Sequence, residues 1–230
     1  MSITTDSVQR GVAVRPFAAF LPYVVVGAVH LVAKLVDNVA LDQFTKPLLM
    51  PLLLVGFLFA LPRRRSEVAL LGSLAIAFSW LGDVSLLYSG DLGFLTGLGF
   101  FLLAHVAYLL LIIRKLRMRR LGPFALIYAA WWVSLVVLLA PHLGSLLIPV
   151  AVYGLVLSAV AAFGTTGSVP LIAGTALFLV SDTLLGVNRF LPGFELWQVD
   201  FIIMLTYIVG QGLIAYAAVR AAANQEKRLQ

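Results

Sequence analysis

The feature that most constrains the fold of this chain is a series of long apolar segments separated by short polar loops. An α-helix needs about 20 mostly apolar residues to cross the hydrocarbon layer of a bilayer. Because 62% of the residues are hydrophobic and only 11% are charged, a water-soluble fold could not bury these side chains. The sequence therefore predicts an all-α, polytopic membrane helix bundle. Eight segments are predicted to span, at roughly 17–36, 46–61, 67–88, 92–113, 122–140, 144–163, 170–191 and 198–219.

The second predicted segment, 46–61, is shorter than the others and contains Pro47 and Pro51. Proline has no backbone N–H and disturbs the interior of a helix. We therefore expect this helix to be tilted or broken, with Lys46 at its start.

The basic residues predict the orientation of the bundle, because Lys and Arg are enriched in cytoplasmic loops. With eight crossings and a cytoplasmic N-terminus, Lys46 and Arg189 lie on the opposite side and Lys34 near a helix end. The remaining thirteen of the sixteen are cytoplasmic: Arg10, Arg15, Arg63, Arg64, Arg65, Arg114, Lys115, Arg117, Arg119, Arg120, Arg220, Lys227 and Arg228. The sequence thus predicts a multi-pass protein of the cell (inner) membrane. Residues 1–16 and 220–230 are cytoplasmic tails, and 17–219 form a single transmembrane domain.

The same distribution explains the net charge of +6 without a nucleic-acid partner. The absence of cysteine excludes disulfides, thiolate metal sites and a cysteine nucleophile. His30, His105, Asp83 and Asp182 are metal-ligand types within the predicted helices, but no HExxH or paired-histidine motif is present. We therefore predict neither a metal nor a cofactor.

Asp83 and Asp182 are the sharpest functional candidates, because an ionisable residue inside a membrane helix costs at least about 2.5–3.5 kcal/mol to insert. At about 1.5 Å per residue, Asp83 lies about 24 Å from Glu67 and Asp182 about 18 Å from Pro170, in the middle or outer half of the membrane. One carboxyl group can stay protonated as a general acid while the other, ionised, activates water. The alternative is structural, with an aspartate capping a helix break or pairing with Lys34.

An offset of 99 residues aligns Asp83 with Asp182 and Tyr108 with Tyr207. This offset indicates a parallel repeat of two four-helix halves, an arrangement found in membrane proteins. Chance similarity between apolar helices explains the same observation, and the residues leave both readings open.

Further polar side chains are spaced to share helix faces. His105 and Tyr108 are three residues apart, and Tyr207 and Gln211 are four apart. We expect these four to line a polar cavity with the aspartates, although a tyrosine in a membrane helix also serves as a packing residue or interface anchor. Lys46 either extends its ammonium group to the interface or holds a lipid phosphate by charge.

Several strings in a fixed order resemble the motifs of one family. They are Lys46-Pro47-Leu48; Ser79 to Asp83 followed by Gly97, Phe100, Phe101, His105 and Tyr108; Gly174 to Phe178 with Ser181-Asp182 and Arg189-Phe190; and Tyr207 to Gln211. Their order and spacing resemble the YhhN family, whose members include the lysoplasmalogenases. The resemblance covers nearly all of the chain after residue 20 and is weakest in the first helix.

This resemblance implies hydrolysis of the vinyl ether bond of a lysoplasmalogen, giving a fatty aldehyde and a glycerophospho-base. The implied partners are a lysophospholipid substrate and membrane lipids, and the oligomeric state stays open. The acid and base would be Asp83 and Asp182. The predicted substrate-binding residues are Lys46, His105, Tyr108, Ser181, Asn188, Tyr207 and Gln211. The residues alone also fit a proton-coupled transporter or lipid-transport protein with the same buried aspartates, or a hydrolase that uses a bound metal.

Overall fold

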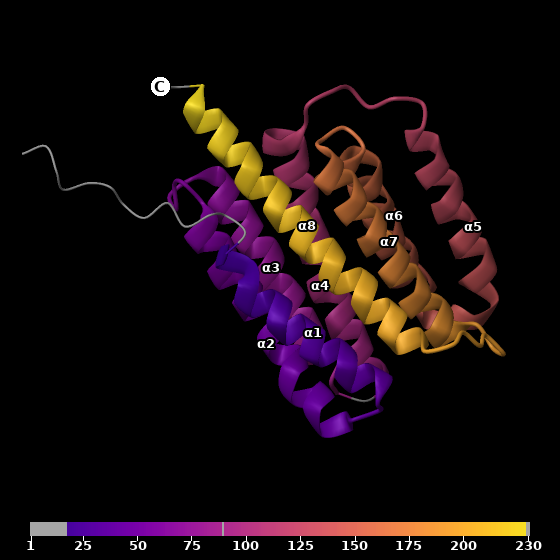
Figure 1. Ribbon diagram of the computed structural model, residues 1–230. Helices are drawn as coiled ribbons and strands as arrows, with labels where there is room; N and C mark the ends of the chain where they lie inside the picture. The colour runs from indigo at the N-terminus through magenta and orange to yellow at the C-terminus, as the bar shows by residue number, and fades with distance from the viewer. Residues whose placement is uncertain (1–17, 89, 229–230) are drawn as a thin grey trace, which may run out of the picture.

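A computed structural model describes residues 18–88 and 90–228 of the protein. Over these residues it contains eight α-helices and no β-strand (Figure 1). The predicted all-α class is confirmed. The helices are α1 Leu21–Leu35, α2 Val39–Ala60, α3 Glu67–Ser85, α4 Asp91–Leu111, α5 Ala125–Leu143, α6 Leu147–Gly164, α7 Val169–Phe190 and α8 Val199–Lys227.

Within the described residues, seven continuous helical segments, rather than the eight expected, are long and apolar enough to cross a membrane. The longest, Ala125–Gly164, contains both α5 and α6, joined by a short 3-10 turn at Gly144–Leu146. Gly144 has φ 50°, in the left-handed region that favours glycine, and there the chain reverses so that α6 packs back along α5. The predicted segments 122–140 and 144–163 are therefore the two arms of one hairpin.

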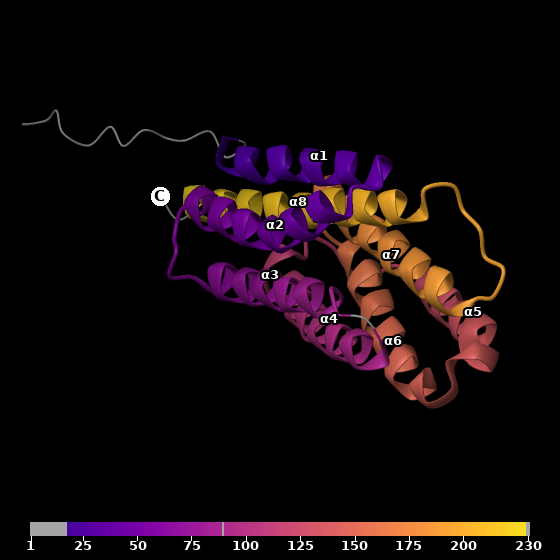
Figure 2. The same cartoon turned by 90° about the horizontal axis from the view of Figure 1, so that it is seen from below.

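Helix α8 lies along the middle of the bundle and contacts α1, α2, α3 and α7 (Figures 1 and 2). The most extensively packed pairs are α3 with α4 and α7 with α8. Helix α6 connects the two pairs, because it packs on both α4 and α7. Helix α5 packs on α6 and α7 at one edge. This arrangement brings α3, α4, α6, α7 and α8 around a common interior.

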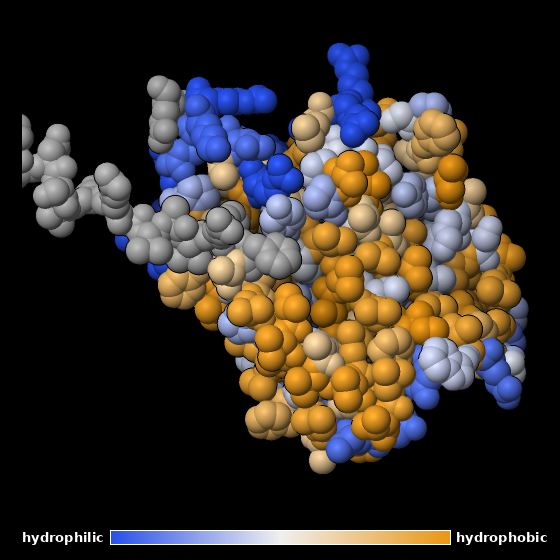
Figure 3. Space-filling model, viewed as in Figure 1, coloured by the Kyte–Doolittle hydropathy of each residue, from blue (hydrophilic) through white to orange (hydrophobic). Residues whose placement is uncertain are grey.

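The distribution of polar and apolar side chains is the reverse of that in a water-soluble protein. Large apolar side chains such as Phe44 and Leu92 are 69% and 79% exposed, and Figure 3 shows a broad hydrophobic band with hydrophilic atoms gathered toward its ends. Polar side chains instead lie inside, among them His105 and Gln211, each with no exposed surface. This pattern fits a bilayer as the surrounding solvent and a polar interior.

Helix α2 corrects the prediction for segment 46–61. It begins at Val39, where the Asn38 side chain accepts a hydrogen bond from the Leu41 backbone N–H, and it runs unbroken through Pro47 and Pro51. Lys46 therefore lies two turns inside the helix, not at its start. Pro51 cannot donate to the Pro47 carbonyl, and the Trp80 indole N–H donates to that oxygen instead, at 2.9 Å.

Four charged segments meet at one end of the bundle. Glu67, which begins α3, pairs with Arg114 at 2.5 Å and Lys115 at 2.7 Å just beyond α4. Arg63, in the loop after α2, pairs with Glu226 near the end of α8 at 3.2 Å. Figure 2 shows the start of α1 and the end of α8 at this same end. The predicted clustering of basic segments on one side is thus present in three dimensions.

The structure describes one of the two predicted cytoplasmic tails and not the other. Residues 1–16 lie outside the described residues. Helix α8 continues through Lys227, so most of the predicted tail 220–230 is a helical extension of the last span. The helix continues because residues 220–227 contain no glycine or proline to end it.

Two glycines allow α7 and α8 to approach closely. A Cβ atom on Gly174 would lie 2.9 Å from the Gly210 carbonyl oxygen, and one on Gly210 would lie 3.0 Å from the Gly174 carbonyl oxygen. Small residues at such crossings allow close packing of membrane helices. The contact fixes the two helices that carry Asp182 and Tyr207.

Candidate active site

Asp83 is buried near the end of α3, and only 3% of its surface is exposed. The hydroxyl group of Tyr207 on α8 donates a hydrogen bond to its Oδ2 atom at 2.8 Å. The positive charge of Lys46 on α2 also acts on this carboxyl group. The alternative in which Lys34 pairs with one of the two aspartates is wrong, because Lys34 binds Asp42 at 2.9 Å.

Asp182 lies in the middle of α7 and accepts a hydrogen bond from the Tyr153 hydroxyl group of α6. His105 on α4 places its Nε2 atom 3.8 Å from Asp182 Oδ2. Its Nδ1 atom lies 2.7 Å from the Phe101 carbonyl oxygen, and a carbonyl only accepts, so Nδ1 carries a proton. In the neutral ring Nε2 then has a free lone pair, and this buried atom has no hydrogen-bond partner among the described residues.

Gln211 of α8 forms hydrogen bonds with α4 and with α3, the helix that carries Asp83. Its Oε1 atom accepts from the Tyr108 hydroxyl group of α4, and its Nε2 atom donates to Ser79 Oγ of α3 at 3.0 Å. Ser79 lies one turn before Asp83 on the same helix. The predicted association of Tyr108, Tyr207 and Gln211 with an aspartate thus appears at Asp83.

Phe178, which has no exposed surface, contacts both His105, beside Asp182, and Tyr207, beside Asp83. Its ring centroid is 4.6 Å from that of His105 and 5.4 Å from that of Tyr207, both in edge-on geometry. The two aspartates are close enough for the charge of Asp83 to act on Asp182. The interior therefore holds two carboxyl groups that interact electrostatically but have different hydrogen-bond partners.

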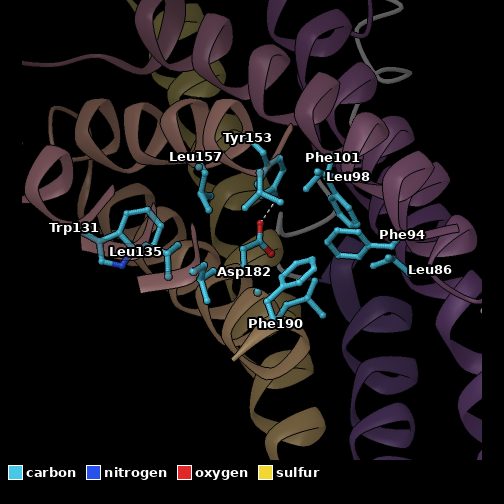
Figure 4. A pocket seen from close by; sticks show the side chains of 15 residues that line it. Leu86, Phe94, Leu98, Phe101, Trp131, Leu135, Tyr153, Leu157, Asp182 and Phe190 are labelled. Carbon is cyan, nitrogen blue, oxygen red and sulfur yellow. Dashed lines mark hydrogen bonds between the residues drawn. The ribbon is translucent and has the colours of Figure 1, made fainter. Parts of the chain in front are cut away.

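An apolar pocket of about 50 Å³ opens beside Asp182 (Figure 4). Phe101, Trp131, Leu157 and Phe190 are among its lining residues, contributed by α4, α5, α6 and α7. By volume it accommodates about three to five water-sized groups. Its polar side chains are Asp182, Tyr153 and Trp131, which has an indole N–H, whereas Asp83 does not line it. A molecule that occupied this pocket would therefore contact Asp182 and not Asp83.

None of the seven predicted substrate-binding residues lines the apolar pocket, and three of them also make no hydrogen bond with the groups around Asp83 and Asp182. The hydroxyl group of Ser181 donates to the Ile203 carbonyl oxygen of α8 at 3.0 Å, an interhelical bond. Asn188 is exposed near the end of α7. Lys46 is half-buried on α2.

Sequence reasoning missed Tyr153. It lies 29 residues before its partner Asp182 and on a different helix, so no local spacing links the two. A single tyrosine in an apolar segment is usually a packing residue or an anchor. Only the packing of α6 on α7 identifies it.

The candidate metal ligands do not gather. His30 on α1 binds Thr45 on α2 at 2.8 Å, next to Asp42, while His105 lies beside Asp182. Within residues 18–88 and 90–228, no group of three His, Cys, Asp or Glu side chains has a geometry that could hold a metal ion.

Comparison with known proteins connects these residues to a family. Lysoplasmalogenases of Mycobacterium bovis and Mycobacterium tuberculosis are each 37% identical to this chain over 111 residues, covering 44% of this chain and 42% of the relative. The match thus spans about two fifths of the length of these curated relatives. No solved structure matches the chain. The YhhN family matches residues 41–218, which include every helix of the site, and the chain therefore belongs to the YhhN family.

Proposed function

We propose that this protein is a membrane-embedded hydrolase that cleaves the vinyl ether bond of a lysoplasmalogen with Asp182 and Asp83. The observation that carries the proposal is Asp182, held by Tyr153 and beside His105, facing an apolar pocket within the membrane bundle. The distant relationship to lysoplasmalogenases supports the same substrate class. A one-tailed lipid suits an apolar pocket that also carries a few polar groups.

The first chemical step is the transfer of a proton to the β-carbon of the vinyl ether. Asp182 is the carboxyl group that lines the pocket, so in this mechanism its protonated form donates to that carbon. The double bond supplies the electron pair for the new C–H bond. The α-carbon and the ether oxygen then share a positive charge as an oxocarbenium ion.

The second carboxyl group stabilises that cation. In the proposed mechanism Asp83 is the ionised partner, because it does not line the pocket and its charge acts on Asp182. A fixed negative charge in a low-dielectric interior lowers the energy of a nearby developing cation. Tyr207 keeps Asp83 in place by donating to its Oδ2 atom.

Water completes the reaction by adding to the α-carbon. His105 Nε2, with its free lone pair beside Asp182, accepts a proton as the water attacks. In the resulting hemiacetal the hydroxyl proton passes to the glycerol oxygen as the C–O bond breaks, so the glycerol part leaves as an alcohol. The proton on His105 then passes to Asp182, 3.8 Å away, and restores the acid. The products are a fatty aldehyde and a glycerophospho-base, so one water molecule is consumed for each bond cleaved.

The orientation of the bundle is part of the proposal. The end that carries Arg63, Arg114 and Lys115 is rich in basic residues, which favours the cytoplasmic side of the cell (inner) membrane. Both ends of the chain are then cytoplasmic, and residues 17–219 act as one transmembrane domain. Asp83 and Asp182 lie toward the opposite half.

The test supplies purified protein in detergent with a lysoplasmalogen and, separately, with an ester lysophospholipid of the same tail. The expected result is release of fatty aldehyde from the vinyl ether lipid and no fatty acid from the ester. Cleavage of the ester instead would indicate a different hydrolase. Binding of the vinyl ether lipid without any aldehyde would overturn the hydrolase proposal and favour a transport role.

A further inference from the structure

The outer rim of the apolar pocket carries one strongly fixed cation, Arg189. Its guanidinium carbon lies 4.2 Å from the ring centroid of Phe94 and 5.6 Å from that of Phe190. Both rings line the pocket, and they pack edge-on at 5.3 Å from each other. Stacking of this kind orients a guanidinium group without using its N–H donors.

Arg189 is also in register with Asp182. Seven residues separate them on α7, which corresponds to two helical turns on the same face and about 10.5 Å along the axis. The lysines nearest this half of the bundle, Lys34 and Lys46, belong to α1 and α2, and neither lines the pocket. Arg189 does not line the pocket either, but it stacks on two rings that do, so it is the basic side chain best placed to act on a molecule that reaches Asp182.

The partner of Arg189 is an exposed carboxylate. Asp91, at the start of α4, accepts from Arg189 Nη2 at 3.0 Å, and its side chain is 86% exposed. An exposed ion pair of this type is weak and exchanges readily with other ligands. An open hollow of about 550 Å³ begins here, and its lining combines polar side chains, among them Asp91, His142 and Ser145, with leucines and Phe190. Phe190 also lines the apolar pocket, so the two spaces are neighbours.

From this arrangement we infer that Arg189 and Asp91 bind the zwitterionic headgroup of the substrate, with Arg189 on the phosphate and Asp91 on the ammonium group. The inference rests on the proposed function and specifies the headgroup class that this site takes. Guanidinium and phosphate form strong charge-assisted hydrogen bonds. When the headgroup binds, the ion pair between Arg189 and Asp91 breaks. Arg189 then binds the phosphate and Asp91 binds the ammonium group.

The spacing fits a lysophospholipid. Six bonds join the α-carbon of the vinyl ether to the phosphorus atom, which spans roughly 7–8 Å in an extended zigzag that advances about 1.25 Å per bond. A charge-assisted hydrogen bond adds about 2.8 Å. The sum matches the axial distance of about 10.5 Å between Asp182 and Arg189. The vinyl ether end of the tail then lies beside Trp131 and Leu157.

The experiment measures equilibrium binding to the full chain in detergent, with ligands that lack the vinyl double bond and so are not hydrolysed. The probes are a radiolabelled 1-O-alkyl lysophosphoethanolamine and a 1-O-alkylglycerol of the same chain length. Arg189→Gln is expected to weaken binding of the first about tenfold and of the second less than twofold. Retained binding of the alkylglycerol shows that the variant is folded.

Arg64→Gln is the matched control, because Arg64 also stacks on an aromatic ring, Phe59, but in the loop after α2 and away from this pocket. This control should bind both probes as the unsubstituted protein does. Asp91→Asn should weaken the lysophosphoethanolamine probe but not a 1-O-alkyl glycerophosphate, which has no ammonium group.

Equal loss of both probes in Arg189→Gln, or no preference of the unsubstituted protein for the phosphorylated probe, would overturn the inference. These binding results do not depend on aldehyde release. Failure of the hydrolase proposal would instead appear as headgroup-dependent binding without turnover of a vinyl ether lipid.

Discussion

Asp83 and Asp182 follow similar local strings but lie in different surroundings. Asp83 is 3% exposed, receives its hydrogen bond from Tyr207 and has Gln211 and its partners nearby. Asp182 receives its hydrogen bond from Tyr153 and faces a pocket. The comparison teaches that two chemically equal groups can differ in access alone, since Asp182 lines the pocket and Asp83 does not. The proposed mechanism assigns their different roles on this basis.

The comparison also bears on the internal repeat. Under the 99-residue offset, Tyr207 corresponds to Tyr108, so a symmetric structure would pair Tyr108 with Asp182 as Tyr207 pairs with Asp83. Tyr108 instead donates to Gln211, and Tyr153 serves Asp182. The hydrogen bonding of the two centres is therefore not repeated, and the structure gives the repeat no support at this point.

The largest expected effect is on turnover. Asp182→Asn should lower kcat about 10⁴-fold because the proton donor to carbon is lost. Asp83→Asn should lower it about 10²–10³-fold because only electrostatic stabilisation is lost. Aldehyde release by the purified variants measures both. Asp200→Asn, an exposed aspartate in the first turn of α8, is the matched control. A larger loss in Asp83→Asn would reverse the assignment of the two roles.

A smaller effect, on stability, should separate the two tyrosines. Tyr207→Phe removes the partner of an aspartate that does not line the pocket, so it should lower the free energy of unfolding by about 1–2 kcal/mol. Tyr153→Phe should cost less than about 1 kcal/mol, because water in the pocket can replace the hydroxyl group at Asp182. Unfolding by denaturing detergent measures both variants.

The control for this pair is Tyr216→Phe, on α8 but without a hydrogen bond to either aspartate. It should change the free energy of unfolding by less than about 0.5 kcal/mol. If Tyr153→Phe proved the more costly substitution, Asp182 would have to be the more tightly enclosed of the two carboxyl groups.

The smallest expected effect comes from Gln211→Leu. It leaves the Tyr108 hydroxyl group and Ser79 without their shared partner, but an interhelical hydrogen bond in a membrane protein contributes only about 0.6 kcal/mol on average. We expect a loss of about 1 kcal/mol in the same unfolding assay. A loss above about 3 kcal/mol would show that this network, and not the Tyr207 bond, holds Asp83 in position.

Part of the site was predictable because local rules apply to it. Asp83 and Asp182 are conspicuous in apolar helices, and the four-residue spacing of Tyr207 and Gln211 places both on one face of α8 toward Asp83. The start of α2 was not predictable from hydropathy, since Lys46, Pro47 and Pro51 interrupt the apolar pattern. Inside that helix, the distant indole N–H of Trp80 donates to the Pro47 carbonyl oxygen, which Pro51 leaves without a donor.

The sequence by itself determined that the chain is a helical membrane bundle with basic segments at one end and two aspartates inside. These properties follow from hydrophobicity and charge, which are local and additive along a helix. The tertiary structure alone decided that Tyr153 serves Asp182, that Asp182 rather than Asp83 faces the pocket, and that Arg189 stands at its rim beside Asp91. Such pairings join residues far apart in sequence, so the packing of the helices sets them.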